Sequence, residues 1–229
     1  MPAIIIVIDN GSEVETFEAL ESGGYLKNNL IKYIGLENNI GASGGFSTGM
    51  RLAIEMGADW VWGMDDDALP EKGALEQLLI ANVDGKKHCL WSNVDEDENF
   101  NDKVKRVEGL ILVGFLISRT LIEKVGYPDE KYYMYHDDTD YSLRIKSSGF
   151  EILKVRDSII DHKGFSKRGN AITTINTVFG NVHLLNCEPY RLYYIFRNGF
   201  YVTKKGLSRF NYILKTLFLT APKYLLFRP

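Results

Sequence analysis

The chain reads Trp60-Val61-Trp62-Gly63-Met64-Asp65-Asp66-Asp67, where an apolar run ends in three adjacent carboxylates. If this run forms a strand, the alternation of its side chains places Asp65 and Asp67 on one face and Asp66 on the other. Carboxylates held that close repel each other unless a cation lies between them, and oxygen ligands suit Mg²⁺ or Mn²⁺. The stretch therefore predicts a divalent metal site at the end of a strand. A solvated acidic turn is the alternative.

The composition is that of an ordinary globular protein. The chain has 229 residues, of which 45% are apolar and 25% are charged. A net charge of −3 gives no argument for a nucleic-acid partner. The only cysteines are Cys89 and Cys187, without the paired spacing of a metal site, which favours a reducing compartment. We therefore expect a cytoplasmic protein that binds no nucleic acid.

Apolar runs alternate with segments of helical spacing along the chain. The expected strands are Ala3–Ile8, Ile31–Leu36, Asp59–Met64, Cys89–Asn93, Leu110–Ile117, Ile152–Val155 and Ser158–Ile160. The expected helices are Val14–Leu20, a segment through Met56, Pro70–Leu79, Arg119–Val125, Asp138–Ser148 and a segment from Tyr190. This alternation predicts an α/β fold in which helices flank a mainly parallel sheet, with ligands beyond the carboxyl ends of the strands.

A loop of small residues, Asn38–Phe46, opens one of these helices. Such a loop lets the backbone approach an anion, and a helix N-terminus favours negative charge. It lacks both the Walker lysine and the dinucleotide glycine fingerprint, so a tight turn remains an equal alternative. Because Asp9, Asn38 and Asp65 each follow an apolar strand, we expect them to gather at one edge of the sheet.

A second acidic cluster occupies residues 136–141, which read His-Asp-Asp-Thr-Asp-Tyr. Asp138 or Thr139 would cap the following helix if the cluster is only structural. The cluster holds more acids than a cap requires, so we favour a general base among them. The helix N-terminus stabilises a charged carboxylate there and the neighbouring acids oppose it, and the sequence leaves the balance open.

His162 follows the apolar pair Ile159-Ile160, at the expected end of a strand. A neutral ring nitrogen at such a position can bind a metal. A lone histidine is more often an ordinary surface or core residue. Taken alone, His162 is therefore a weak ligand candidate.

Charge is unevenly distributed, because no acidic residue follows Glu188 whereas eight Lys and Arg residues do. We therefore divide the chain into a domain at 1–188 and a basic, aromatic-rich helical segment at 189–229. The apolar run Tyr212–Ala221 is shorter than the roughly 20 residues that a spanning helix needs. Peripheral contact with the inner face of the cell membrane and packing on the core fit this segment equally.

In this order the motifs resemble family 2 glycosyltransferases, which have the GT-A (nucleotide-diphospho-sugar transferase) fold. The segments that carry the resemblance are Val7–Ser12, Asn38–Gly41, Gly44–Phe46, Met64–Asp67 and Asp137–Arg144. The closest likeness is to bacterial galactofuranosyltransferases and rhamnosyltransferases. Tyr193–Asn198 also resembles the C-terminal segment of these enzymes. The resemblance covers most of residues 3–200.

The resemblance implies an inverting, metal-dependent transfer of a sugar from UDP-galactofuranose or dTDP-rhamnose to a cell-envelope glycan, free or lipid-linked. Asp138 would deprotonate the acceptor hydroxyl, and no covalent nucleophile would be needed. The other implied roles are Mg²⁺ or Mn²⁺ binding for Asp65, Asp67 and His162; donor binding for Asp9, Asn38, Gly41, Gly44, Gly45 and Asp66; and acceptor binding for Asp137 and Trp62, with Trp62 or Phe46 near the donor sugar.

One departure from the family keeps a second hypothesis open. Family members begin with another strand and helix before the one carrying Val7–Ser12, and we expect this domain to lack them. A truncated, inactive domain that at most binds nucleotide or a partner chain is therefore the alternative to an enzyme. A phosphohydrolase with an Asp nucleophile is less favoured, because Asp65–Ala68 lacks a Thr/Val-rich continuation and a downstream Lys. The oligomeric state stays open.

Overall fold

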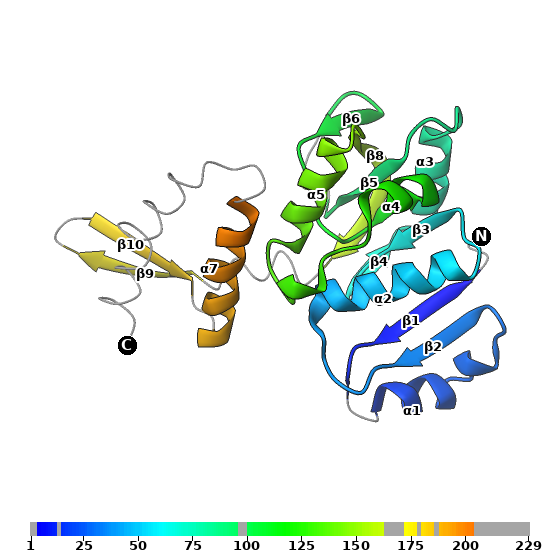
Figure 1. The fold of residues 1–229 in the computed structure, drawn as a ribbon, viewed down its shortest axis with the longest axis horizontal. Helices are drawn as coiled ribbons and strands as arrows, with labels where there is room; N and C mark the ends of the chain where they lie inside the picture. Colours follow the sequence, from blue (N-terminus) through cyan, green and yellow to red (C-terminus); the bar gives the residue numbers. More distant parts are fainter. Residues whose placement is uncertain are drawn as a thin grey trace.

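The protein is built on a mixed sheet flanked by helices (Figure 1). The computed structural model describes residues 4–12, 15–95, 100–162, 172–177, 180–185 and 188–203. The strands are β1 Ile5–Asp9, β2 Ile31–Gly35, β3 Trp60–Gly63, β4 Ala68–Pro70, β5 Cys89–Val94, β6 Val104–Val107, β7 Phe115–Ser118, β8 Ile152–His162, β9 Ile172–Thr177 and β10 Gly180–Leu185. The helices are α1 Glu15–Ser22, α2 Gly41–Glu55, α3 Ala74–Ala81, α4 Arg119–Val125, α5 Asp137–Ser147 and α7 Pro189–Thr203, with short 3₁₀ turns η1 Tyr25–Lys27 and η2 Glu130–Tyr132.

The largest sheet has six strands in the order β3-β7-β5-β8-β4, with β6 also paired to β8. Strand β8 is long enough to hold β6 along Ile152–Val155 and β4 along Ile160–His162. The pairs β5/β8 and β1/β2 are parallel, whereas β3/β7, β5/β7, β4/β8 and β6/β8 are antiparallel. The expected parallel arrangement is therefore realised in part of a mixed sheet.

Strands β1 and β2 form a separate parallel pair, in which Asp9 lies opposite Gly35. Parallel strands end at the same edge, and this pairing brings the residues after each strand together. The Leu36 amide donates to the Asp9 carbonyl at 2.9 Å. A Cβ on Gly11, whose φ is +73°, would lie 2.4 Å from the Asn39 nitrogen, so only glycine fits there. The expectation that Asp9, Asn38 and Asp65 gather at one sheet edge is confirmed for Asp9 and Asn38, whereas Asp65 follows β3, which belongs to the six-stranded sheet.

The core lies on both faces of β5, all of whose residues are buried. Leu90 points to the side of α3, where it packs with Leu78, Leu116 and Val155. Cys89 and Trp91 point to the opposite face and join the larger cluster. Period-two alternation between two covered faces explains why every residue of this strand is buried, the polar Ser92 and Asn93 included. Burial raises the pKa of the Cys89 thiol to about 12.

Several helices and strands begin or end at other residues than the sequence predicts. Pro70 lies in β4 rather than in a helix, and α3 begins only at Ala74. Strand β4 is at the edge of the sheet, where a residue without an N–H is tolerated. The expected strand at Leu110–Ile117 begins at Phe115, and the two strands expected within residues 152–160 are one strand, β8. Helix α4 spans the expected residues, and α5 starts one residue early.

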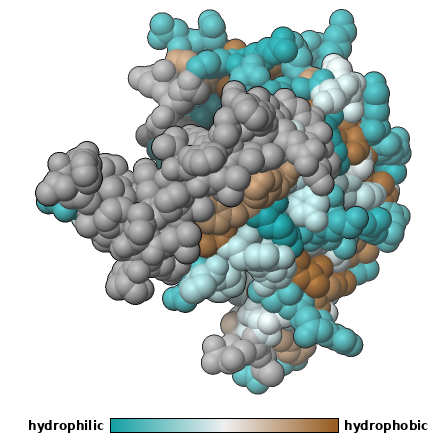
Figure 2. Space-filling view, turned by 60° about the vertical axis from the view of Figure 1, so that its left-hand side comes forward, coloured by the Kyte–Doolittle hydropathy of each residue, from teal (hydrophilic) through white to brown (hydrophobic). Residues whose placement is uncertain are grey.

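At the C-terminal end, α7 lies beside α5 and the β9–β10 hairpin lies beyond it (Figure 1). The hairpin falls where the sequence shows no clear pattern. Within the part of the chain that the structure describes, none of the helices has the length and apolar content to cross a bilayer. Residues 204–229, most of the predicted basic segment, lie outside the described residues. Elsewhere on the face seen in Figure 2, polar and apolar side chains are interspersed.

Gly63 provides a test of the packing between β3 and β7. A Cβ at this position would lie 2.1 Å from the Phe115 ring, which is fully buried. We expect Gly63→Ala to lower the free energy of unfolding by about 1–3 kcal/mol, measured by urea denaturation, because the core is overpacked. In the double variant with Phe115→Leu the shorter side chain leaves room, so the two losses should be less than additive. Strict additivity would contradict this account.

Candidate active site

Strand β4 brings the acidic triplet to His162. The strand pairs antiparallel with β8 so that Ala68 lies directly opposite His162. The prediction that strand alternation holds Asp65 and Asp67 together is wrong, because β3 ends at Gly63 and both residues lie in the connection to β4. The Ala68 amide donates to the Asp65 carbonyl at 3.3 Å, which closes this connection as a tight turn. The two carboxylates therefore converge through a turn.

Asp65, Asp67 and His162 form a group that can bind a metal, which we call the metal-ligand group. One potential ligand atom from each residue lies within 4.8 Å of the others. The His162 Nε2 is 2.8 Å from Asp67 Oδ1 and 4.0 Å from Asp65 Oδ2. Metal–ligand bonds of about 2.1 Å place neighbouring ligands of an octahedral ion about 3 Å apart and opposite ligands about 4.2 Å apart. The donor set, two carboxylates and an imidazole, fits Mn²⁺ or Mg²⁺.

The burial of these side chains differs in a way that suits a substrate-bound cation. The His162 side chain is only 2% exposed, whereas the side chains of Asp65 and Asp67 are 37% and 43% exposed. The imidazole is therefore fixed by packing. The carboxylates face solvent, from which a cation and its substrate can arrive.

Sequence reasoning missed Asp95, which holds the His162 backbone. Its Oδ1 accepts a hydrogen bond from the His162 amide at 2.5 Å, and the Asp95 amide donates to the Ile160 carbonyl at 2.8 Å. Asp95 follows β5 directly and has a φ of +54°, uncommon outside glycine. The signal that could have found it is an acid directly after an apolar strand, the same rule that selects Asp9 and Asp65.

A second part of the site joins the end of β1 to the loop before α2. Both Asp9 carboxylate oxygens accept hydrogen bonds, from Tyr33 Oη at 2.6 Å and from the Ser12 amide at 2.8 Å. The Tyr33 hydrogen bond, with those from Ser12, holds the pKa of Asp9 below its ordinary value although burial opposes this. Asn10 bridges to the loop, with Nδ2 donating to the Gly41 carbonyl and Oδ1 accepting from the Ile40 amide.

The glycines of this loop differ in how much room there is for a Cβ atom. Gly41 has a φ of +80°, and a Cβ there would lie 2.1 Å from the Tyr133 carbonyl oxygen. At Gly44 a Cβ would meet the Ile40 side chain at 2.7 Å. At Gly45 the nearest contact would be 3.6 Å away, on Asn10. Close packing therefore explains Gly41 and Gly44. Gly45, half-buried near Asn10, is not explained by close packing.

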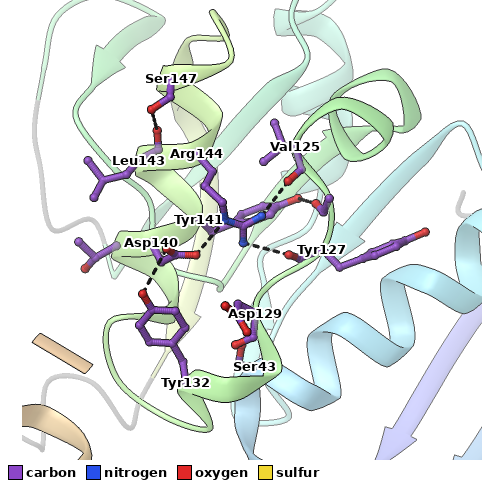
Figure 3. A network of polar contacts seen from close by, with 12 residues as sticks. Ser43, Val125, Tyr127, Asp129, Tyr132, Asp140, Tyr141, Leu143, Arg144 and Ser147 are labelled. Carbon is purple, nitrogen blue, oxygen red and sulfur yellow. Dashed lines mark hydrogen bonds and ion pairs between the residues drawn. The ribbon is translucent and has the colours of Figure 1, made fainter. Parts of the chain in front are cut away.

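The second acidic cluster starts α5, and Figure 3 shows the partners of one of its members, Asp140. Asp140 is fully buried and accepts from Arg144 Nε at 2.8 Å and from Tyr132 Oη at 3.2 Å, so it is structural. Arg144 also donates to the carbonyls of Val125 and Tyr127, which ties α5 to the preceding segment.

Asp137 and Asp138 precede this ion pair in the first turn of α5. Asp138 is half-buried, and its Oδ1 accepts from the amide and the hydroxyl of Thr139. Burial raises the pKa of Asp137 to about 6, and the charges of Asp138 and Asp65 add to the increase. The contribution of Asp65 indicates that its carboxylate lies on the same side of the molecule as the start of α5.

Trp62 lies on β3 ahead of the triplet, opposite Leu116 of β7. Its indole Nε1 is buried, without a hydrogen-bond partner among the described residues. Phe46 of α2 packs edge-on against Phe115 in the core. Neither position by itself shows contact with a ligand.

The family model named glycosyl transferase family 2 matches residues 3–146, more than half of the chain. The chain belongs to glycosyl transferase family 2. Among curated relatives, this chain is 24% identical over 237 residues to the galactofuranosyltransferase GlfT1 of Mycobacterium tuberculosis. The alignment covers 91% of this chain and 75% of the relative. It is 26% identical over 177 residues to GlfT1 of Mycolicibacterium smegmatis, covering 65% and 57%.

Solved structures confirm the predicted GT-A fold of the transferase. A crystal structure of TarS residues 1–349 from S. aureus has a TM-score of 0.60 at 11% identity, covering all of this chain and 68% of that one. GalNAc-T7, solved with UDP, GalNAc and Mn²⁺, has a TM-score of 0.60 at 16% identity, covering 70% and 37%. The mannosyltransferase PcManGT of Pyrobaculum calidifontis, solved with GDP-Man and Mn²⁺, has a TM-score of 0.55 at 15% identity, covering 73% and 52%.

The raised pKa of Asp137 predicts a pH dependence of stability for the metal-free transferase. The folded state keeps a proton up to about pH 6 that the unfolded chain releases near pH 3.8. The parent protein should therefore lose stability as pH rises through this window. Asp137→Asn lacks this loss, so its advantage in unfolding free energy should grow by up to about 3 kcal/mol from pH 4 to pH 7.

Denaturant titrations in EDTA across this pH range measure the effect. Asp84→Asn is the control, because a hydrogen bond from Lys87 holds the pKa of Asp84 low and its removal changes the pH dependence in the opposite direction. A constant difference between Asp137→Asn and the parent at all pH values would show that Asp137 does not retain its proton.

Proposed function

We propose that this chain is a metal-dependent, inverting glycosyltransferase that moves a furanose of the galactofuranose class from a nucleotide donor to a glycan acceptor. The observation that carries the proposal is the Asp65–Asp67–His162 group, whose ligand atoms lie within 4.8 Å of one another in a GT-A fold. Metal ligands are unnecessary in a domain that only binds a partner chain, which disfavours that form of the inactive alternative. An inactive domain that binds nucleotide would keep them, and sugar transfer by the parent protein distinguishes it from an enzyme.

The donor class rests on the relatives. GlfT1 proteins are galactofuranosyltransferases, which favours UDP-galactofuranose over dTDP-rhamnose. Structures of GalNAc-T7 and TarS contain UDP, and the Mn²⁺ in two of the structural neighbours supports a divalent ion here. The acceptor we propose is a cell-envelope glycan, free or lipid-linked, approached from the inner face of the membrane.

The chain's own residues provide binding and proton transfer. Asp65, Asp67 and His162 would hold the divalent ion, which when bound neutralises charge on the leaving diphosphate. Asp9 keeps a charged carboxylate beside the glycine loop, where we place the nucleoside. We place the donor against Asn38, Gly41, Gly44, Gly45 and Asp66.

Asp138 is the base in this proposal. Thr139 anchors one of its oxygens, which leaves the carboxylate in a defined orientation at the N-terminus of α5. It accepts the proton of the acceptor hydroxyl as that oxygen attacks the anomeric carbon and the diphosphate departs, so a single displacement inverts the configuration. Asp137, more buried, orients the acceptor, and we place Trp62 of β3 beside it as the second acceptor residue.

Removal of the carboxylate ligands tests the metal assignment. We expect Asp65→Ala with Asp67→Ala to lose Mn²⁺ binding in calorimetry and to reduce sugar transfer by at least about 100-fold, because both oxygen ligands are lost. Asp84→Asn, which removes a surface carboxylate paired with Lys87, should leave both unchanged. Transfer by the double variant at the parent rate would exclude this group as the metal site.

Replacement of the base separates chemistry from binding. Asp138→Asn should lower kcat by about 100- to 10,000-fold while KM for the donor stays near the parent value, since the amide cannot accept the proton. Initial rates at saturating acceptor measure both constants. An equal loss of donor affinity would place Asp138 in donor binding.

A thermal-shift panel tests the donor. UDP-galactofuranose with Mn²⁺ should raise Tm, whereas the same donor in EDTA and dTDP-rhamnose with Mn²⁺ should have smaller effects, because stabilisation follows ligand affinity. A rise with dTDP-rhamnose alone would replace the galactofuranose assignment by a rhamnose one.

A further inference from the structure

The segment that leads into Asp137 has an unusual backbone. Tyr133, Tyr135 and His136 have φ values of 62°, 64° and 64°, in the left-handed region that side chains with a Cβ rarely adopt. Such conformations persist only where the surroundings determine them. Contacts from α7 and from the start of α2 hold residues 132–136 in this form.

Asn198 of α7 provides one set of contacts. Its side chain is fully buried, and Nδ2 donates to the carbonyls of Tyr132 at 2.8 Å, Met134 at 2.7 Å and Tyr135 at 2.9 Å. An amide nitrogen carries two hydrogens, so at least one of them is shared between acceptors. A single side chain thus binds three carbonyls of the unusual segment.

Arg197 fixes the orientation of that amide. Its Nε donates to Asn198 Oδ1 at 2.8 Å, which leaves Nδ2 to face the carbonyls. An amide turned the other way would set its oxygen against three carbonyl oxygens, so the hydrogen-bond network allows one orientation. The guanidinium also donates to the carbonyls of Lys131 and Tyr132 and lies 4.6 Å from the centre of the Tyr194 ring.

The start of α2 holds the segment from another direction. The Ser43 amide donates to the Tyr133 carbonyl at 3.4 Å, and Ser43 Oγ donates to the Asp129 carbonyl at 2.9 Å (Figure 3). Gly41 packs against the same Tyr133 carbonyl. The segment is therefore held between α7 and the loop in which we place the donor.

We propose that Asn198 is a positioning residue, which holds residues 132–136 so that Asp137 and Asp138 face the metal-ligand group. The inference rests on the proposed function, in which Asp138 is the base. His136 begins α5 by accepting the Asp140 amide at 2.9 Å, so the backbone that Asn198 holds continues directly into both acids. Arg144 ties α5 to the carbonyls of Val125 and Tyr127, outside the segment that Asn198 holds, so loss of Asn198 should loosen the segment without unfolding the helix.

Three variants of the full chain test this inference. Asn198→Ala removes the donors, and Asn198→Asp keeps the shape of the side chain but cannot donate to a carbonyl. Thr203→Val is the matched control, because Thr203 is also buried on α7 but, among the described residues, its hydroxyl donates to the Phe200 carbonyl of the same helix. For each variant, kcat, donor KM, Mn²⁺ affinity, Tm and amide hydrogen exchange of residues 131–138 are measured.

We expect both Asn198 variants to lower kcat by about 10- to 100-fold, the effect of displacing a catalytic group by about 1 Å. Donor KM and Mn²⁺ affinity should stay within about 2-fold of the parent, because the ligands of both lie elsewhere. Exchange at residues 131–138 should be at least about 10-fold faster. Thr203→Val should match the parent in kcat and exchange.

Other results have defined meanings. If the parent is active and Asn198→Asp has the parent's kcat or the parent's exchange rates, the positioning role is overturned, since packing alone would then suffice. Equal losses in Thr203→Val would assign the effect to the docking of α7 in general and would also overturn it. A parent that transfers no sugar with any donor would overturn the proposed function, and with it the role of Asn198 in catalysis, whatever the exchange shows.

Discussion

The antiparallel pairing of β4 with β8 is the contact on which the metal-ligand group depends. β4 has only three residues, yet its register sets Ala68 opposite His162 and brings the turn that carries Asp65 and Asp67 against the imidazole. Backbone hydrogen bonds define a register within one residue, because a slip of one position would turn every side chain to the other face. The position of Asp67, 2.8 Å from His162 Nε2, follows from that constraint.

The site collects groups that are unfavourable together without a ligand. Two exposed carboxylates and a buried imidazole converge, and a third carboxylate, Asp137, has its pKa raised by burial and by nearby acids. Elsewhere the described core is apolar or paired, as at Asp140 with Arg144. Unfavourable electrostatics confined to one region of an otherwise consistent fold are typical of a functional site.

Contacts between distant segments shape both sides of this region. The Asp95 carboxylate holds the backbone of His162, and the Asn198 amide holds the carbonyls that precede Asp137. In each case a polar side chain, half-buried at Asp95 and fully buried at Asn198, binds main-chain groups beside a residue that we place in the site. Main-chain contacts of this kind orient a loop more strictly than side-chain packing does, because hydrogen bonds depend on direction.

The sequence by itself determined the family, the GT-A fold and the residues that form the metal-ligand group, because glycine-rich and acidic motifs recur in a recognisable order after apolar runs. It also predicted α5 to within one residue at each end, since helical periodicity is local. It placed Asp65 and Asp67 together for a wrong reason, strand alternation, where the structure has a turn. Only the tertiary structure decided that Pro70 belongs to an edge strand, that Asp95 supports His162 and that Asn198 binds residues 132–135. Those contacts join positions at least 63 residues apart, and they depend on pairing between segments that no local period in the sequence records.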